Sequence, residues 1–489
     1  MGTILRLSSF IFIFFIVIYS ISQLEEIAQV IRADSKYRYS EDTSIYIFGS
    51  FTILFSSLVV FSQSISRKYF LVTPTLLFWL LFIFMVFPGV VFTKEISSSN
   101  GSYYYMISSL LFALGVFFSS RVLRFRKREE FKTFKKRIYE NRFLLLNEKL
   151  WLRIVLIISI FLILILQFFT TQNYLLGIDL LRILIETGSS EAGILQQQRE
   201  DIYVSGLGAF DYLLRYLVRI VIPISALALF IDAFYRRKRF QYLFYIFAFL
   251  FGVFIAFGSG SRMFAMHLLL IGLIVFLMYK NLSLKTLGVI FTPALSLLVA
   301  QTVVLGRFFT EGFTPIQIIF MSLNRLSERI FLTKGVVTSY VFDYFPNIEE
   351  FLAGKSISQS LLGNISNDLS LSRTMFMYIR GGDGTAGPQA FGELYANFGY
   401  LGLVFCFLIG FIVQTVSVLS VRAKRITPLK ILYISYIAFL IGLVGYGKIL
   451  AFKTYGIHVL FVFMAINFFI LAIIRYAIQK NIILTRKSN

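Results

Sequence analysis

Cysteine and histidine are nearly absent from this chain. One cysteine, Cys406, and two histidines, His267 and His458, occur among its 489 residues. A single cysteine excludes an internal disulfide. Two histidines far apart in the sequence do not supply the ligand cluster that a histidine-rich metal site needs. The sequence therefore predicts no disulfide framework and no bound metal.

The motifs of nucleotide and metal chemistry are missing as well. The chain has no Walker A pattern, no G-x-G-x-x-G after a strand, no H-E-x-x-H and no D-x-D. Acidic residues are also few. The chain has 25 Asp and Glu residues and 47 Lys and Arg residues, which gives a net charge of +22. We attribute this excess to short basic loops on one side of a membrane rather than to nucleic acid. No nucleic-acid partner and no cofactor are predicted.

Long apolar runs are what the chain has in abundance. Hydrophobic residues make up 57% of it, and the mean hydropathy is +0.78. The runs are about 17–22 residues long, which is the length that a helix needs to cross about 30 Å of hydrocarbon. The sequence predicts an all-α polytopic membrane protein, with about twelve spans in one transmembrane domain, 1–489. The expected spans are 4–21, 44–64, 70–92, 103–120, 151–170, 212–232, 240–257, 263–279, 286–305, 391–416, 429–446 and 455–475.

Basic clusters between these spans fall on one side. The largest is in the loop 121–150, and RAKR at 422–425 and the RKSN C-terminus lie on the same side. The positive-inside bias predicts that this side, with both termini, is cytoplasmic. Two long loops, 171–211 and 306–390, then face outward. Loops of this length are often functional or carry helices, and short amphipathic helices are expected in both. In the larger loop, apolar residues at helical spacing predict one such helix at 314–332, lying along the membrane surface.

Arginines are numerous in the outer half of the protein. Arg215 and Arg219 are four residues apart near the outer end of one predicted span, and so share one helix face. Planar guanidinium groups suit phosphate oxygens. The alternative is that each arginine reaches lipid headgroups or pairs with a nearby acid. The candidates for phosphate binding are Arg215, Arg219, Arg262, Arg325, Arg373 and Arg380.

One carboxylate stands at the start of the predicted span 391–416. Glu393 and Asn397 are one helical turn apart in the segment GELYANFGYLG, with Tyr395 between them. The structural interpretation is an acid in the first turn of a helix, where the helix dipole favours it. The functional interpretation is a general base at the membrane boundary. The sequence leaves both open.

The residues around this carboxylate resemble a known family. PQAFGELYANFGYLG resembles the segment that opens a late span in Wzy-type O-antigen polymerases, the bacterial oligosaccharide repeat-unit polymerases. The resemblance extends to the number of spans and to the large outer loop just before this segment. It also includes an R-x10-G pattern in two outer loops, here Arg182 to Gly193 and Arg373 to Gly384.

The resemblance implies a GT-C-like layout and a glycosyl transfer at the outer face of the bacterial cytoplasmic membrane. A hydroxyl of one lipid-linked glycan attacks the anomeric carbon of another, and undecaprenyl diphosphate leaves. With this chemistry, Glu393 is the expected base and the six arginines are the expected diphosphate ligands, without a metal. Arg182, Tyr395 and Asn397 are expected on the acceptor side. Membrane lipids and a chain-length regulator are further expected partners, in the assembly of a polysaccharide such as that of lipopolysaccharide.

Three other functions fit parts of the sequence. A flippase for the same lipid-linked unit needs polar residues around a cavity at the membrane midplane and has little use for a large outer loop. An O-antigen ligase has a similar layout but typically uses a histidine in that loop, and 306–390 contains none. A scaffolding membrane protein leaves the outer arginines unexplained.

Overall fold

The computed structural model describes residues 43–66, 71–91, 99–169, 216–258, 262–279, 333–362, 370–380, 386–450 and 456–487. Within these ranges the chain forms helices and no strand, which confirms the all-α class. Five helical segments are long and apolar enough to cross a membrane, namely Thr43–Ser64, Gly101–Val122, Leu217–Tyr235, Ala390–Arg422 and Pro428–Tyr446. The total of about twelve spans stays a prediction. The predicted spans 4–21 and 286–305 and the outer loop 171–211 lie outside the described residues.

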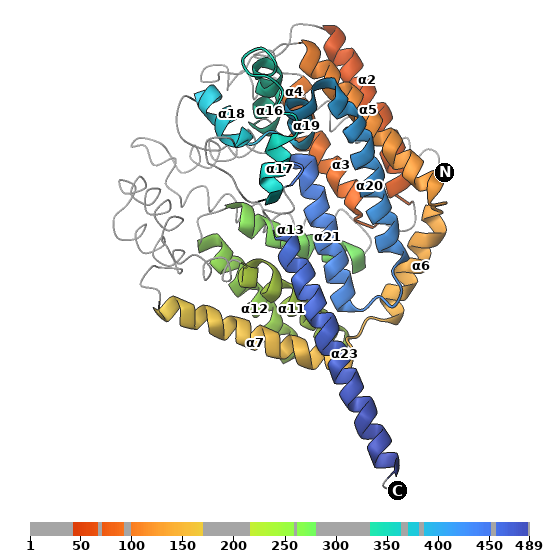
Figure 1. The fold of residues 1–489 in the computed structure, drawn as a ribbon. Coiled ribbons are helices and arrows are strands. Elements are labelled where there is room, and N and C mark those ends of the chain that lie inside the picture. Colours follow the sequence, from red (N-terminus) through yellow and green to blue (C-terminus); the bar gives the residue numbers. More distant parts are fainter. Residues whose placement is uncertain are drawn as a thin grey trace, which may run out of the picture.

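The helices form two packed groups (Figure 1). The first group consists of α2 (Thr43–Ser64), α3 (Pro74–Met85), α4 (Phe87–Val91), α5 (Ser99–Val122) and α20 (Gly402–Arg422). The second consists of α6 (Lys127–Glu140), α7 (Leu146–Phe169), η2 (Leu217–Val221), α11 (Ile222–Tyr235), α12 (Arg239–Gly258), α13 (Arg262–Tyr279), α21 (Pro428–Tyr446) and α23 (Ile457–Lys487). Helix α21 joins the groups, because it packs against α3 on one side and against α11 and α13 on the other.

Close backbone contact holds α5 against α20. A side chain at Gly410 would collide with the carbonyl of Phe112, and one at Gly115 would collide with the carbonyl of Phe407. Small residues allow this approach in membrane helices, where apolar burial alone gives little drive for association. A buried hydrogen bond also joins the two helices, because Gln414 of α20 donates to Ser120 of α5 at 2.9 Å.

Basic segments gather at one end of the molecule, the lower end in Figure 1, where α6 and α7 lie. Arg422 at the end of α20 binds Glu130 of α6 at 2.7 Å. Arg137 of α6 donates to the carbonyl of Ala423 at 3.0 Å. The loop 121–150 therefore lies beside 422–425, which agrees with the prediction that both lie on the same side of the membrane.

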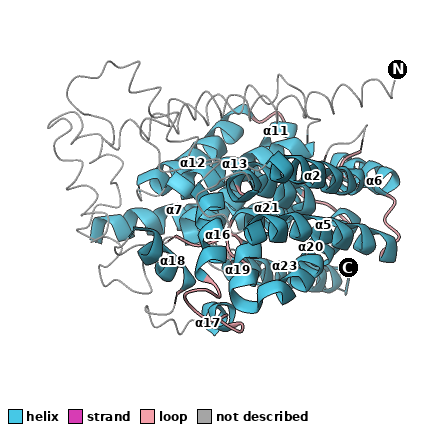
Figure 2. Ribbon diagram, turned by 90° about the horizontal axis from the view of Figure 1, so that it is seen from above, coloured by secondary structure: helices cyan, strands magenta, loops and turns pink. Residues whose placement is uncertain are grey.

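Four short helices lie at the opposite end and form what we call the cap: α16 (Thr333–Tyr344), α17 (Lys355–Leu362), α18 (Leu371–Arg380) and α19 (Ala390–Phe398). Figure 2 shows α16 and α19 side by side, with α17 and α18 at the edge. The helix predicted at 314–332 lies outside the described residues, whereas the described part of 306–390 contains α16, α17 and α18.

The predicted span 391–416 is a broken helix. Its first part, α19, ends at Phe398, and a single 3₁₀ turn, Gly399–Leu401, precedes α20. Gly399 has a φ of 56°, a conformation that favours glycine. With 21 residues, α20 is about 30 Å long and can cross the hydrocarbon alone. Glu393 therefore lies in α19, before this break, and the correction to the prediction is that the helix of this segment is not continuous.

Helix α7 covers the predicted span 151–170 but runs nearly crosswise to α20 and α21 in Figure 1. Its first turns carry Glu148, Lys149 and Arg153. The helix is not among the five segments that satisfy the length and polarity of a span. Its role as a span stays a prediction.

Candidate functional site

The cap contains a buried polar stripe on α19. Gln389, Glu393 and Asn397 are spaced four residues apart, so they line one side of the helix. Each is at most 1% exposed. Gln389 is the N-cap, and its side-chain oxygen accepts the N–H of Phe391 at 2.8 Å. A short helix whose polar side is wholly buried needs partners for that side from other elements.

Helices α5 and α16 hold the beginning of this stripe. The hydroxyl of Tyr105 in α5 donates to Gln389 Oε1 at 2.8 Å and accepts the N–H of Gly392 at 3.0 Å. The N–H of Gln389 donates to Thr338 Oγ1 of α16 at 2.9 Å. These bonds fix the position of α19 relative to the first helix group.

Glu393 is bound more firmly on one oxygen than on the other. Its Oε2 accepts the N–H of Ile449 at 2.8 Å, whereas Ser356 Oγ lies 3.5 Å from Oε1. Asn397 Nδ2 donates to Ser356 Oγ and to the carbonyl of Glu393, each at 2.7 Å. Within the described residues, Asn397 Oδ1 is buried without a hydrogen-bond partner. Of the two carboxylate oxygens of Glu393, Oε1 has the longer hydrogen bond.

Two half-buried lysines from other elements interact electrostatically with Glu393. Lys334 begins α16, and its Nζ donates to the carbonyl of Gly387 at 2.7 Å. Lys448 follows α21. Burial lowers the pKa of Lys334 to about 8; the charge of Lys448 acts in the same direction, and Glu393 opposes both. Burial also lowers the pKa of Lys448, again against the effect of Glu393.

We call this set the α19 polar cluster; it comprises Lys334, Ser356, Gln389, Glu393, Asn397 and Lys448. Neither lysine was predicted as a partner of Glu393, because both lie outside the predicted span 391–416, which contains no basic residue. One signal was available. Lys448 stands at the predicted outer end of the span 429–446, against the positive-inside bias.

Tyr395, a predicted acceptor-side residue, packs among aromatic rings. Its ring centroid lies 4.4 Å from that of Phe342 and 5.0 Å from that of Tyr104. The side chain is 5% exposed. Tyr395 thus contributes to the core of the first helix group, whereas Asn397 belongs to the α19 polar cluster.

Arg219 lies in a different place, in the π-helical segment η2. Tyr436 of α21 donates to the Arg219 carbonyl at 2.7 Å. The two residues, with His267 and Phe439, line a small cavity of about 20 Å³, which has room for about one water molecule. His267 is not among the residues that the sequence predicts for the site.

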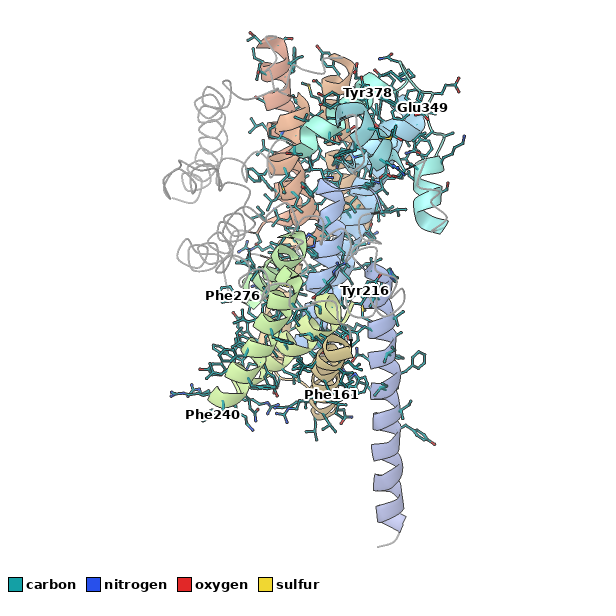
Figure 3. The ribbon with its side chains drawn as sticks, turned by 90° about the vertical axis from the view of Figure 1, so that its left-hand side faces the viewer. Phe161, Tyr216, Phe240, Phe276, Glu349 and Tyr378 are labelled. Carbon is teal, nitrogen blue, oxygen red and sulfur yellow. The ribbon has the colours of Figure 1, made fainter. Side chains whose placement is uncertain are left out.

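The residues that contact Arg219 and Glu393 are far apart along the axis of α21. Tyr436 touches the first, and Ile449, beyond the helix end at Tyr446, touches the second. Ten residues of α-helix rise about 15 Å, several times the roughly 3–3.5 Å between reacting atoms. Figure 3 agrees, because Tyr216, next to η2, lies at mid-height and Tyr378 of the cap lies at the top. The structure does not bring Arg219 and Glu393 into one compact site.

The other predicted arginines divide as follows. Arg373 is in the first turn of α18, directly after Ser372, and so belongs to the cap. Arg380 ends α18 and Arg262 begins α13, but the structure describes only the backbone of these two residues. Arg182, Arg215 and Arg325 lie outside the described residues.

Comparison of the chain with protein-family models, with curated proteins and with solved structures gives no match. The relation to Wzy-type polymerases therefore stays a prediction from the sequence. In the described part of the chain, no group of three His, Cys, Asp or Glu side chains could hold a metal ion.

Proposed function

We propose that this protein polymerises undecaprenyl-diphosphate-linked oligosaccharide repeat units at the outer face of the bacterial cytoplasmic membrane. The observation that supports this most is the buried Glu393 carboxylate of the cap, which interacts with Lys334 of the cap and with Lys448, just after α21. The cap lies at the end opposite the basic segments, which is the outer end by the positive-inside bias. Nucleotide sugars are not available there, so a glycosyl donor must arrive already activated on a lipid.

In this reaction Glu393 takes the proton of the attacking acceptor hydroxyl. The acceptor oxygen forms a bond to the anomeric carbon of the donor, and the bond between that carbon and the diphosphate oxygen breaks. Cations beside the leaving diphosphate stabilise its charge without a metal. A carboxylate oxygen that accepts only a long hydrogen bond is the better acceptor for this proton. Glu393 Oε1 is such an oxygen, because its hydrogen bond from Ser356 is 3.5 Å long.

The alternatives have less support. A flippase needs a polar cavity near the midplane, whereas the α19 polar cluster belongs to the cap at one end of the molecule. The ligase alternative lacks a histidine in 306–390.

The orientation is tested with single cysteines in a Cys406→Ser background. Ser358 of α17, in the cap, and Lys132 of α6, among the basic segments, are both exposed, so each can carry the label. We expect an impermeant thiol reagent to label Ser358→Cys in intact cells, or in spheroplasts where an outer membrane is present, and to spare Lys132→Cys until the membrane is opened. The reverse pattern would place the cap in the cytoplasm and remove the basis of the proposal.

The activity is tested by reconstituting the purified protein with lipid-linked repeat units extracted from its own host. We expect a ladder of longer glycans, with one undecaprenyl diphosphate released for each glycosidic bond. The ladder should persist in EDTA, because the expected ligands of the diphosphate are cationic side chains. Movement of the lipid-linked unit across the bilayer without bond formation would instead identify a flippase, and transfer only to lipid A would identify a ligase.

A further inference from the structure

Gly387 is the meeting point of two lysines that come from distant parts of the chain. Lys334 Nζ donates to the Gly387 carbonyl at 2.7 Å. On the other side, a Cβ built on Gly387 would lie 2.7 Å from Lys448 Cε and 2.8 Å from Ser372 Oγ. The absence of a side chain at this position is what lets Lys448 pass.

Among the described residues at this point, two lysines share one carboxylate. Lys334 and Lys448 repel each other, and each is stabilised by the same carboxylate, Glu393. That carboxylate is bound by a backbone N–H and is 1% exposed. Like charges held close together in a partly buried place are unfavourable unless an anion compensates them.

We propose that Lys334 and Lys448, arranged around Gly387, bind the diphosphate of the lipid-linked substrate. This inference rests on the proposed function and deepens it, because it moves the diphosphate from Arg219 to the α19 polar cluster. The leaving group and the proposed base, Glu393, then belong to one site, as a single displacement requires.

The proposal is tested by binding, apart from activity. Purified full-length protein in detergent is titrated with undecaprenyl diphosphate, with undecaprenol and phosphatidylglycerol as the other two probes. We expect undecaprenyl diphosphate to bind at least about 10-fold more tightly than either probe, since charge-assisted hydrogen bonds to the diphosphate are lost without it. Equal binding of phosphatidylglycerol would overturn the proposal, because the cations would then be a site for lipid headgroups.

Variants decide which residues hold the diphosphate. Lys334→Ala and Lys448→Ala should each weaken binding on the order of 10- to 100-fold, the range for a hydrogen bond to a charged group. Gly387→Ala should weaken it too, because it displaces only the flexible end of Lys448 and the Ser372 hydroxyl and leaves the backbone unstrained. Lys355→Ala, an exposed lysine of the same cap, is the matched control and should bind as the unaltered protein does.

The outcomes separate this inference from the proposed function. Unchanged undecaprenyl diphosphate binding by folded Lys448→Ala, Lys334→Ala and Gly387→Ala proteins would overturn the inference, even if the protein polymerises. Weakened binding in a protein that forms no glycosidic bond would support the site and overturn the polymerase proposal.

Discussion

Glu393→Gln should fold, insert and bind donor, yet make little or no long polymer. The side chain keeps its size, and its oxygen can still accept the N–H of Ile449. What it loses is the ability to take a proton, and removal of a general base typically lowers the rate by about 10²–10⁴. The measurement is the length of the glycan ladder at matched membrane levels, followed by turnover of the purified variant.

Two controls separate catalysis from structure. Ser356→Ala removes the 3.5 Å contact with Glu393 Oε1 and the 2.7 Å hydrogen bond from Asn397 Nδ2, but no group that takes the proton, and should leave most activity in place. The melting temperature of Glu393→Gln should stay near that of the unaltered protein. If stability and activity fall together, Glu393 is instead the buried counter-ion of the two lysines, and its part in the reaction is rejected.

Asp232→Ala should be the most damaging single change to the fold. Asp232 is fully buried near the basic end, where its carboxylate binds Lys149 at 2.7 Å and Arg236 at 2.9 Å. It also accepts the N–H of Leu144 at 3.1 Å, so it ties the start of α7 to α11. Removal of one partner from a buried ion pair costs up to about 3–5 kcal/mol. Lys149 is 13% exposed and Arg236 is 39% exposed, so most of this cost falls on Lys149 and on the buried N–H of Leu144, which loses its acceptor.

The matched control is Glu140→Ala in α6. Glu140 pairs with Lys136 at 3.6 Å, but these side chains are 56% and 74% exposed. Exposed pairs contribute about 0–1 kcal/mol. Unfolding of the purified variants by heat and by denaturant should therefore separate them clearly. An Asp232→Ala protein as stable as Glu140→Ala would show that this ion pair does not support the fold.

The surroundings of Glu393 could be predicted from the sequence only in part. Glu393 and Asn397 could be selected from the sequence because helical periodicity acts over a few residues, and both prove to be buried on the same side of α19. Their partners could not be selected this way. Ser356 is 37 residues away along the chain, and Ile449 is 56. Contacts of this kind depend on proximity in space, which no local pattern reports.

The sequence by itself determined the membrane class and the grouping of the basic segments. Both follow from quantities that are read along the chain, since bilayer thickness sets the length of an apolar helix and loop charge sets its side. Only the tertiary structure decided that the predicted span 391–416 breaks at Gly399, that Lys334 and Lys448 meet at Gly387, and that Arg219 lies at another level of α21. The physical reason is that a break in a helix, an electrostatic cluster and a separation between two sites are all set by how distant helices pack against one another.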